Sequence, residues 1–215
     1  SISEFKQMGY TSEAMANYMT LLGWSVPEGI NERFKISEIS EIFSFKKVNK
    51  ASAKFDWDKL NWLNSQVIHE MSAKTLLENL DPLLKENGWQ LPSQEWGIHL
   101  IGLIGPSMVL INDGVDQAKP FFEEPELSAD GKKQLEIKEA SVILKFILEK
   151  LENLDSALFS KEEALDLINQ ATKNCGVKKG LVMKSLRAAL FGTLNGPDLI
   201  QSWVLLSRFS KDRTR

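Results

Sequence analysis

The feature that most constrains the fold is a helical hydrophobic periodicity that runs through nearly the whole sequence. Apolar residues recur at spacings of three and four, as at Leu60, Leu63 and Val67. Helix-start signals accompany the pattern, and the clearest is the capping box formed by Ser160 and Glu163. No segment shows the sustained two-residue alternation and hairpin turns of a sheet. The sequence therefore predicts an all-α protein.

Breakers and turn formers divide this pattern into segments. Asp81-Pro82 predicts an interruption and the start of a new short helix. Gly105-Pro106 predicts a helix end. The stretch from Asn112 to Glu126 is rich in turn formers and acids, which predicts a joint between domains. We expect helical units strung along the chain over residues 1–71, 72–127 and 128–215.

Composition and missing motifs exclude several classes of function. One cysteine, Cys175, cannot form a disulfide framework or a thiolate metal cluster within the chain. His69 and His99 are 30 positions apart, and no phosphate-binding or dinucleotide-binding glycine pattern occurs. The sequence therefore predicts no metal site and no catalytic residue in this chain.

The start of the chain lacks a signal peptide, and no apolar run reaches the roughly 18 residues of a membrane span. We expect a cytoplasmic protein without a membrane partner. The chain also begins without an initiator Met, inside a segment that is predicted to be structured. This start predicts a piece of something longer.

One window departs from the overall net charge of −3. Residues 171–197 contain no Asp or Glu but five cationic residues, which are Lys173, Lys178, Lys179, Lys184 and Arg187. Because Lys184 and Arg187 are three apart, they share a helical face. The window predicts a contact site for a phosphate backbone, with Arg187 able to stack on a base or form paired hydrogen bonds with it. The alternative is an ordinary solvated helix face with a basic tail of Arg208, Lys211, Arg213 and Arg215.

Aromatic residues leave two interpretations open. Trp57 and Trp203 match apolar stripes, which predicts that both belong to the core. Trp62 lies off its stripe, close to Lys54 and Lys59. Core packing is the favoured interpretation of Trp62, and contact with a partner is the alternative.

Two strings resemble the bacterial-type glutamyl-tRNA synthetases, which are class I enzymes. Residues 47–64 carry the spacing of that family's stem-contact fold, with Phe55, Asp56, Lys59, Leu60, Trp62 and Asn64. Residues 176–199 resemble its anticodon-binding end, with Leu186, Arg187, Ala189, Leu190 and Gly192. The opening residues also resemble the helix pair that follows the family's second ATP-binding signature. The similarity covers essentially the whole chain in matching order.

The resemblance implies an elongated C-terminal portion, in which a stem-contact domain precedes two helical anticodon-binding domains. The parent enzyme would join glutamate to tRNA-Glu with ATP and Mg²⁺. Neither of the family's ATP-binding signatures occurs here, so the chain alone should bind tRNA without aminoacylating it. The competing hypothesis is an all-helical scaffold that binds another protein. We expect a monomer.

The same resemblance assigns residues. Arg187 matches the arginine that faces the anticodon, and Gly196 and Leu199 match the turn and helix start that pack against its first two bases. The resemblance assigns contacts with the tRNA backbone to Lys178, Lys179 and Lys184. It assigns contacts with the tRNA stem to Lys54, Lys59 and Trp62.

A departure from the family pattern concerns the third anticodon base. Family members that reject tRNA-Gln read this base with an arginine, and the matching position here is at or near Ser107, just after Gly105. No Arg occurs between Gly97 and Gly131. Because small residues cannot replace a guanidinium fork, we predict an enzyme that also charges tRNA-Gln.

Overall fold

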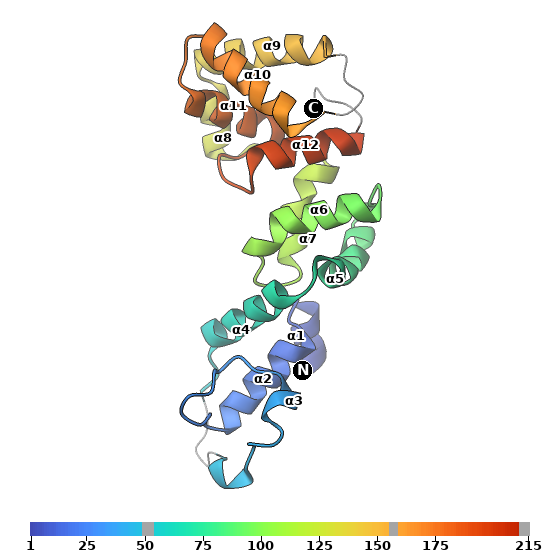
Figure 1. Ribbon diagram of the computed structural model, residues 1–215, viewed down its shortest axis with the longest axis vertical. Helices are drawn as coiled ribbons and strands as arrows, with labels where there is room; N and C mark the ends of the chain where they lie inside the picture. Colours follow the sequence, from blue (N-terminus) through green and yellow to red (C-terminus); the bar gives the residue numbers. More distant parts are fainter. Residues whose placement is uncertain (49–53, 155–158, 211–215) are drawn as a thin grey trace. The chain divides into compact units, whose positions relative to one another are not determined.

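The computed structural model describes residues 1–48, 54–154 and 159–210, and its regular structure is helical (Figure 1). Within these ranges no strand forms, and the single bridge pairs Trp24 with Val48. The all-α prediction is confirmed. None of the described helices combines the length and the apolar character that crossing a bilayer requires.

The chain forms two compact units, and each is made of two separate segments. Unit 1 comprises Ser1–Trp89 and Ile104–Gln117, and unit 2 comprises Gln90–Leu103 and Ala118–Arg215. The division into residues 1–71, 72–127 and 128–215 stays a prediction.

Unit 1 is built on helices α2 and α4, which pack against each other. Buried Tyr18, Leu60 and Leu63 lie in their shared core. Thr11 caps α2 and Asp56 caps α4, each through a side-chain oxygen that accepts a backbone N–H. The elements of unit 1 are α1 (Ile2–Gln7), α2 (Ser12–Gly23), α3 (Ile36–Ile39), η1 (Phe45–Lys47), α4 (Trp57–Glu70), α5 (Ala73–Glu86), η2 (Gly105–Ser107) and the first half of α7 (Asp113–Phe122).

Asn64 joins the two segments of unit 1. It is fully buried on α4, and its Oδ1 accepts hydrogen bonds from the Thr11 backbone N at 2.8 Å and the Thr11 hydroxyl at 3.0 Å. Its Nδ2 donates to the carbonyl oxygens of Val109 at 2.6 Å and Gly9 at 3.3 Å. Ile111 N also donates to Gly9 O. One buried amide therefore fixes three stretches of chain that are far apart in sequence.

Unit 2 packs its helices around buried aliphatic and aromatic side chains. Trp203 on α12 meets Phe159, with ring centroids 4.7 Å apart. Trp96 donates its indole N–H to Leu205 O at 2.9 Å and so ties α6 to α12. Phe121 contacts Phe191 at 5.5 Å and joins α7 to α11. The helices are α6 (Gln94–Ile104), the second half of α7, α8 (Ala129–Leu135), α9 (Lys138–Glu152), α10 (Lys161–Asn174), α11 (Lys179–Phe191) and α12 (Leu199–Ser210).

One sequence prediction about a helix limit is wrong. Helix α5 continues through Pro82, because Leu76, Leu80 and Leu84 on either side of it are all buried on one face. The stretch from Asn112 to Glu126, predicted as a joint, contains α7, and the boundary between units 1 and 2 falls within it, between Gln117 and Ala118.

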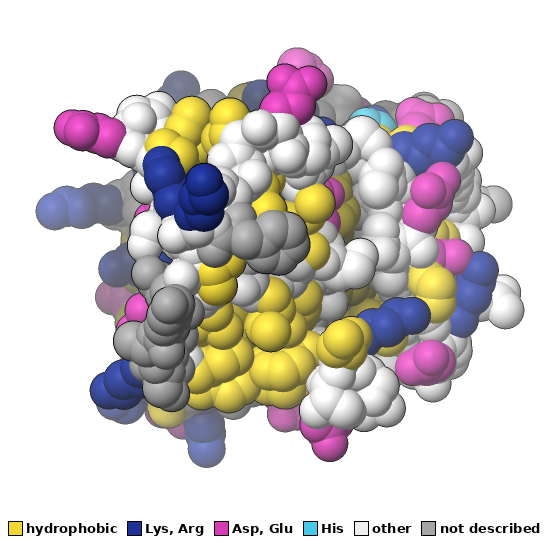
Figure 2. All heavy atoms as spheres, turned by 90° about the horizontal axis from the view of Figure 1, so that it is seen from below, with side chains coloured by type: hydrophobic (Ala, Val, Ile, Leu, Met, Phe, Trp, Pro, Cys, Tyr) yellow, Lys and Arg dark blue, Asp and Glu magenta, His cyan; other side chains and the backbone are white. Residues whose placement is uncertain are grey.

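Exposed large hydrophobic side chains among the described residues belong mostly to unit 1. Trp57, predicted to be core, is 49% exposed and is one of them. It is the first residue of α4, and its ring contacts those of Phe5, in a tilted arrangement, and Phe55, edge to face. Figure 2 shows a face on which hydrophobic side chains gather beside Lys and Arg side chains.

Candidate nucleic-acid interface

Helix α11 supplies the predicted site and is held by an apolar face. Val182, Leu186 and Leu190 are buried in unit 2. The helix ends at Gly192, which adopts a left-handed φ of 72°. A Cβ there would lie 2.2 Å from the Glu126 carbonyl oxygen, so this helix end admits only glycine without a shift of the backbone.

The lysines of α11 face solvent. The side chains of Lys178 at the N-cap and of Lys179 and Lys184 within the helix are exposed, and within the described ranges none of these side chains has a hydrogen bond or ion pair. Lys178 and Lys179 stand at the helix start, where free backbone N–H groups add partial positive charge. The side of α11 predicted to be basic is therefore available to an anion. Lys211, Arg213 and Arg215 lie outside the described residues.

Arg187 lies against the turn that leads into α12. Its Nη2 donates to the Pro197 carbonyl oxygen at 2.8 Å, and Nη1 lies 3.0 Å from where a Cβ on Gly196 would stand. The side chain is half-buried and forms no ion pair within the part of the chain that the structure describes. Burial lowers the pKa of Arg187, whereas the charge of nearby Asp198 acts to raise it. The site thus holds an oriented guanidinium that has N–H groups beyond the one that Pro197 occupies.

Asp198 was missed by the sequence reasoning. Its Oδ1 accepts the Gln201 backbone N–H at 2.8 Å, and its carbonyl accepts from Ser202 N, so it caps α12. The signal was the string Gly196-Pro197-Asp198, in which an acid follows a turn-forming pair. Leu199 is only 2% exposed, so its side chain anchors this turn in the core.

The structure therefore brings together two of the predicted residues, Arg187 and Gly196, and Leu199 follows as the first residue of α12. Any other residue at position 196 would have an unfavourable backbone conformation, since φ there is 147°. Its Cβ would also crowd the Arg187 guanidinium. Glycine at this position lets Arg187 lie flat against the turn.

The predicted stem-contact residues lie in unit 1. Trp62 is 43% exposed, so the core interpretation is wrong. Lys59 pairs with Glu32 and holds its Nζ 5.9 Å from the centroid of the Trp62 ring. Lys54 is exposed, and residues 49–53 just before it lie outside the described residues. Trp62 thus presents an exposed ring beside the ammonium of Lys59, whose side chain is only 33% exposed and is paired with Glu32.

Gly105 and Ser107 form η2, also in unit 1. Gly105 is buried, and Ser107 is exposed with its Oγ 2.6 Å from Gln117 Oε1 and 3.0 Å from Ile104 O. No charged group stands at either position. The position predicted to face the third anticodon base thus presents a hydroxyl that is already hydrogen-bonded.

Among the described residues, no cluster of three or more His, Cys, Asp or Glu side chains could hold a metal ion.

The sequence matches two known families. The family described as "Anticodon binding domain" matches residues 67–211. The family described as "tRNA synthetases class I (E and Q), catalytic domain" matches residues 1–62.

Curated relatives match along the whole chain. The protein named glutamate–tRNA ligase of Prochlorococcus marinus strain NATL2A is 90% identical over 215 residues, and that of strain MIT 9303 is 55% identical. In both cases the match covers 100% of this chain and 45% of the relative. The chain thus spans less than half the length of these relatives.

Solved structures agree in fold. A glutamate tRNA ligase from Elizabethkingia meningosepticum, in complex with its amino acid, superposes with a TM-score of 0.85 at 29% identity and covers 98% of this chain and 40% of that chain. The glutamate-tRNA synthetase of Elizabethkingia anophelis gives a TM-score of 0.80 at 29% identity, with 98% and 41% covered.

Proposed function

We infer that this chain, which belongs to the anticodon binding domain family, is the tRNA-binding portion of a glutamate–tRNA ligase. The support is its 90% identity to a protein of that name, along the full length of the chain. The scaffold hypothesis is not favoured, because both matched families are tRNA-binding or synthetase domains.

The observation that carries the proposal is the geometry around Arg187. Its guanidinium is fixed by the Pro197 carbonyl, and the lysines of the same helix are exposed. The lysines would neutralise backbone phosphates, which positions the RNA without reading its sequence. The guanidinium would stack on an anticodon base or form hydrogen bonds with its edge.

Binding of a tRNA-Glu transcript by Arg187 variants tests the proposal. Arg187→Ala removes the oriented fork, and we expect the Kd to rise by roughly tenfold to a hundredfold in a mobility-shift assay. Arg187→Lys keeps the charge but not the planar fork, so it should restore only part of the affinity.

Lys145→Ala on α9 is the control, because Lys145 is also exposed and has no ion pair in the described ranges. Its Kd should stay close to that of the unaltered chain. Equal Kd values for Arg187→Ala and Lys145→Ala would show that the interface has been misplaced.

We also propose that the parent enzyme accepts tRNA-Gln. The support is the small, uncharged η2 turn at Gly105 and Ser107 and the absence of Arg between Gly97 and Gly131. Aminoacylation by the full-length enzyme should proceed on both tRNAs with kcat/KM values within roughly tenfold of each other, since no guanidinium fork discriminates the third base. A strong preference for tRNA-Glu contradicts this.

In the longer parent, ATP and Mg²⁺ would serve the class I catalytic domain. The chain itself carries no nucleotide-binding signature, so we propose that it does not aminoacylate alone. Lys54, Lys59 and Trp62 would contact the tRNA stem. We further propose a cytoplasmic monomer, and light scattering of the purified chain should give a mass near 24.3 kDa.

A further inference from the structure

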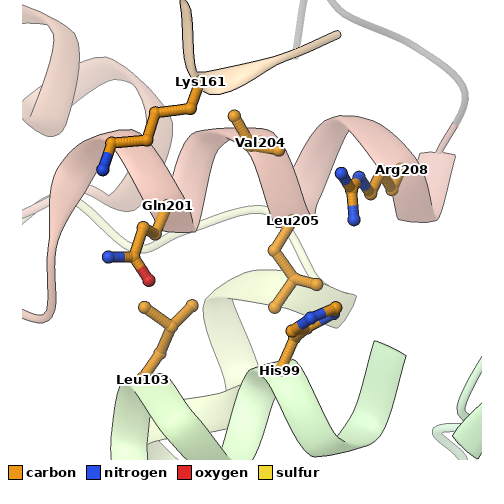
Figure 3. Close-up of a pocket in the computed structure, with 7 residues that line it drawn as sticks. All are labelled: His99, Leu103, Lys161, Gln201, Val204, Leu205 and Arg208. Atoms are coloured by element: carbon orange, nitrogen blue, oxygen red, sulfur yellow. The ribbon is translucent and has the colours of Figure 1, made fainter. Parts of the chain in front are cut away.

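A pocket in unit 2, outside the Arg187 site, has no part in the function proposed above. It holds about 140 Å³ and lies between α6 and α12, beside the first residue of α10. In Figure 3, His99 and Leu103 rise from α6 toward α12, whose Gln201 and Leu205 side chains extend toward α6. The lining residues are His99, Leu103, Lys161, Gln201, Val204, Leu205 and Arg208.

The charged groups of this pocket are all basic. Lys161 and Arg208 are exposed, and within the described ranges neither their side chains nor that of His99 has a hydrogen bond or ion pair. No carboxylate belongs to the lining. Cationic side chains gathered without an acidic partner favour an anionic ligand.

The cations stand at opposite ends of the pocket. Lys161 lies near Gln201, and Arg208 lies at the far side of Leu205 (Figure 3). Gln201 and Arg208 are seven residues apart on α12, which corresponds to about 10 Å along the helix axis. A single phosphate is too small to meet both ends, whereas the long side chains of Lys161 and Arg208 could each reach one of the two phosphates that flank a nucleotide.

The centre of the pocket is apolar and has a polar edge. Leu103, Val204 and Leu205 form a floor on which the flat face of a base could rest. His99 offers an imidazole ring beside it, and the Gln201 amide has both a donor and an acceptor for a base edge. Trp96 lies behind the floor, with its indole bonded to Leu205 O.

We propose that this pocket binds one unpaired nucleotide of a single RNA strand, with its base on the apolar floor and its flanking phosphates at Lys161 and Arg208. The inference extends the proposed function, since the strand would be part of a bound tRNA. The same chemistry could admit a free nucleotide, and the experiment separates these two sources.

The test is NMR titration of the isotope-labelled 215-residue chain with three probes, which are single-stranded A6 RNA, AMP and inorganic phosphate. The reporters are the Gln201 side-chain amide, the His99 ring and the Trp96 indole N–H. A6 RNA should shift all three, and AMP should bind about tenfold more weakly because it supplies one phosphate instead of two. Tighter binding of AMP than of A6 would contradict the proposal and assign the pocket to a free nucleotide.

Lys161→Ala/Arg208→Ala should weaken A6 binding by about tenfold or more. The matched control is Lys132→Ala/Lys145→Ala, which removes the same number of charges from exposed positions on α8 and α9 and should change the Kd less than about twofold. If the two double variants weakened A6 binding equally, the loss would reflect net charge alone, and the pocket assignment would be wrong. It would also be wrong if A6 caused no shifts at the three reporter groups.

Failure of this inference is distinguishable from failure of the proposed function. If Arg187→Ala weakens tRNA binding while the reporters stay silent toward A6, the pocket assignment alone falls. In the opposite case, Arg187→Ala leaves tRNA binding unchanged, A6 shifts the reporters, and the pocket variants weaken A6 binding. The pocket assignment is then supported and the Arg187 interface is wrong.

Discussion

At the scale of single residues, the side chains that matter most find their partners far away in sequence. Asn64 holds Thr11, Gly9 and Val109, and Arg187 holds Pro197. Charge pattern singled out Arg187, whereas Asn64 was noted only through the family resemblance, and a linear pattern contains no information about which carbonyl a side chain will meet.

Replacing Asn64 by Ala should lower the free energy of unfolding by about 2–4 kcal/mol, because it leaves the part-buried Thr11 N–H and Val109 carbonyl without this partner. Chemical denaturation followed by circular dichroism measures the loss. Asn79→Ala on α5 is the control, since Asn79 is exposed and bonds only to its own helix. A loss at Asn64 no larger than that at Asn79 would contradict the structural role assigned here.

The tryptophans show that a match to the apolar stripe of a helix does not by itself predict burial. Trp203 is buried as predicted, but Trp57 matches the stripe of α4 and is exposed. Burial requires a neighbouring element as well as an apolar face, and Trp57 stands at the helix start, where it meets mainly Phe5 and Phe55. Trp62, favoured as core, is exposed beside Lys59.

At the scale of elements, local chemistry predicted helix starts better than helix interruptions. The capping box of Ser160 and Glu163 is present, because it depends only on residues within one turn. The effect of Pro82 was misinterpreted and helix α7 was not predicted, because the effect of a helix breaker depends on packing. In α7, Gly114 is helical and packs so tightly that a Cβ would lie 2.7 Å from Leu80.

Removing the cap of α10 tests the local contribution. Ser160→Ala deletes the acceptor of the Glu163 N–H and should cost about 1 kcal/mol of unfolding free energy. Ser141→Ala, at an exposed position inside α9, should leave stability within about 0.5 kcal/mol. Thermal melts of both variants check this, and equal melting temperatures would contradict it.

Pro82→Ala should act in the opposite direction. Pro82 is exposed inside α5, so alanine restores a backbone N–H without removing a core contact. We expect the free energy of unfolding to rise by about 1–3 kcal/mol in urea denaturation. A decrease would mean that the proline stabilises the helix by a route other than hydrogen bonding.

At the scale of the whole molecule, function depends on how charge is distributed and not on its sum. The net charge is −3, yet residues 171–197 carry no acid, and two lysines of α11 and the lysine that precedes it are exposed. An acidic protein can therefore offer a polyanion a locally attractive surface.

This distribution predicts the salt dependence of tRNA binding. Each of Lys178→Ala, Lys179→Ala and Lys184→Ala should reduce the slope of log K against log salt by about one, as phosphate contacts release counterions. Filter binding across a salt series measures the slope, with Lys145→Ala as the reference. An unchanged slope for all three variants would place the phosphate contacts elsewhere.

The polypeptide leaves unit 1 after Trp89, enters unit 2, and returns at Ile104 to add the second segment of unit 1. Asn112 then donates to the Gln7 carbonyl at 2.8 Å, and Ile111 to that of Gly9. A fragment truncated after Trp89 would lack the partners that Val109, Ile111 and Asn112 provide to Asn64, Gly9 and Gln7. Unit 1 therefore cannot finish folding when Trp89 has been synthesised, because its second segment, Ile104–Gln117, is synthesised only after Gln90–Leu103 of unit 2.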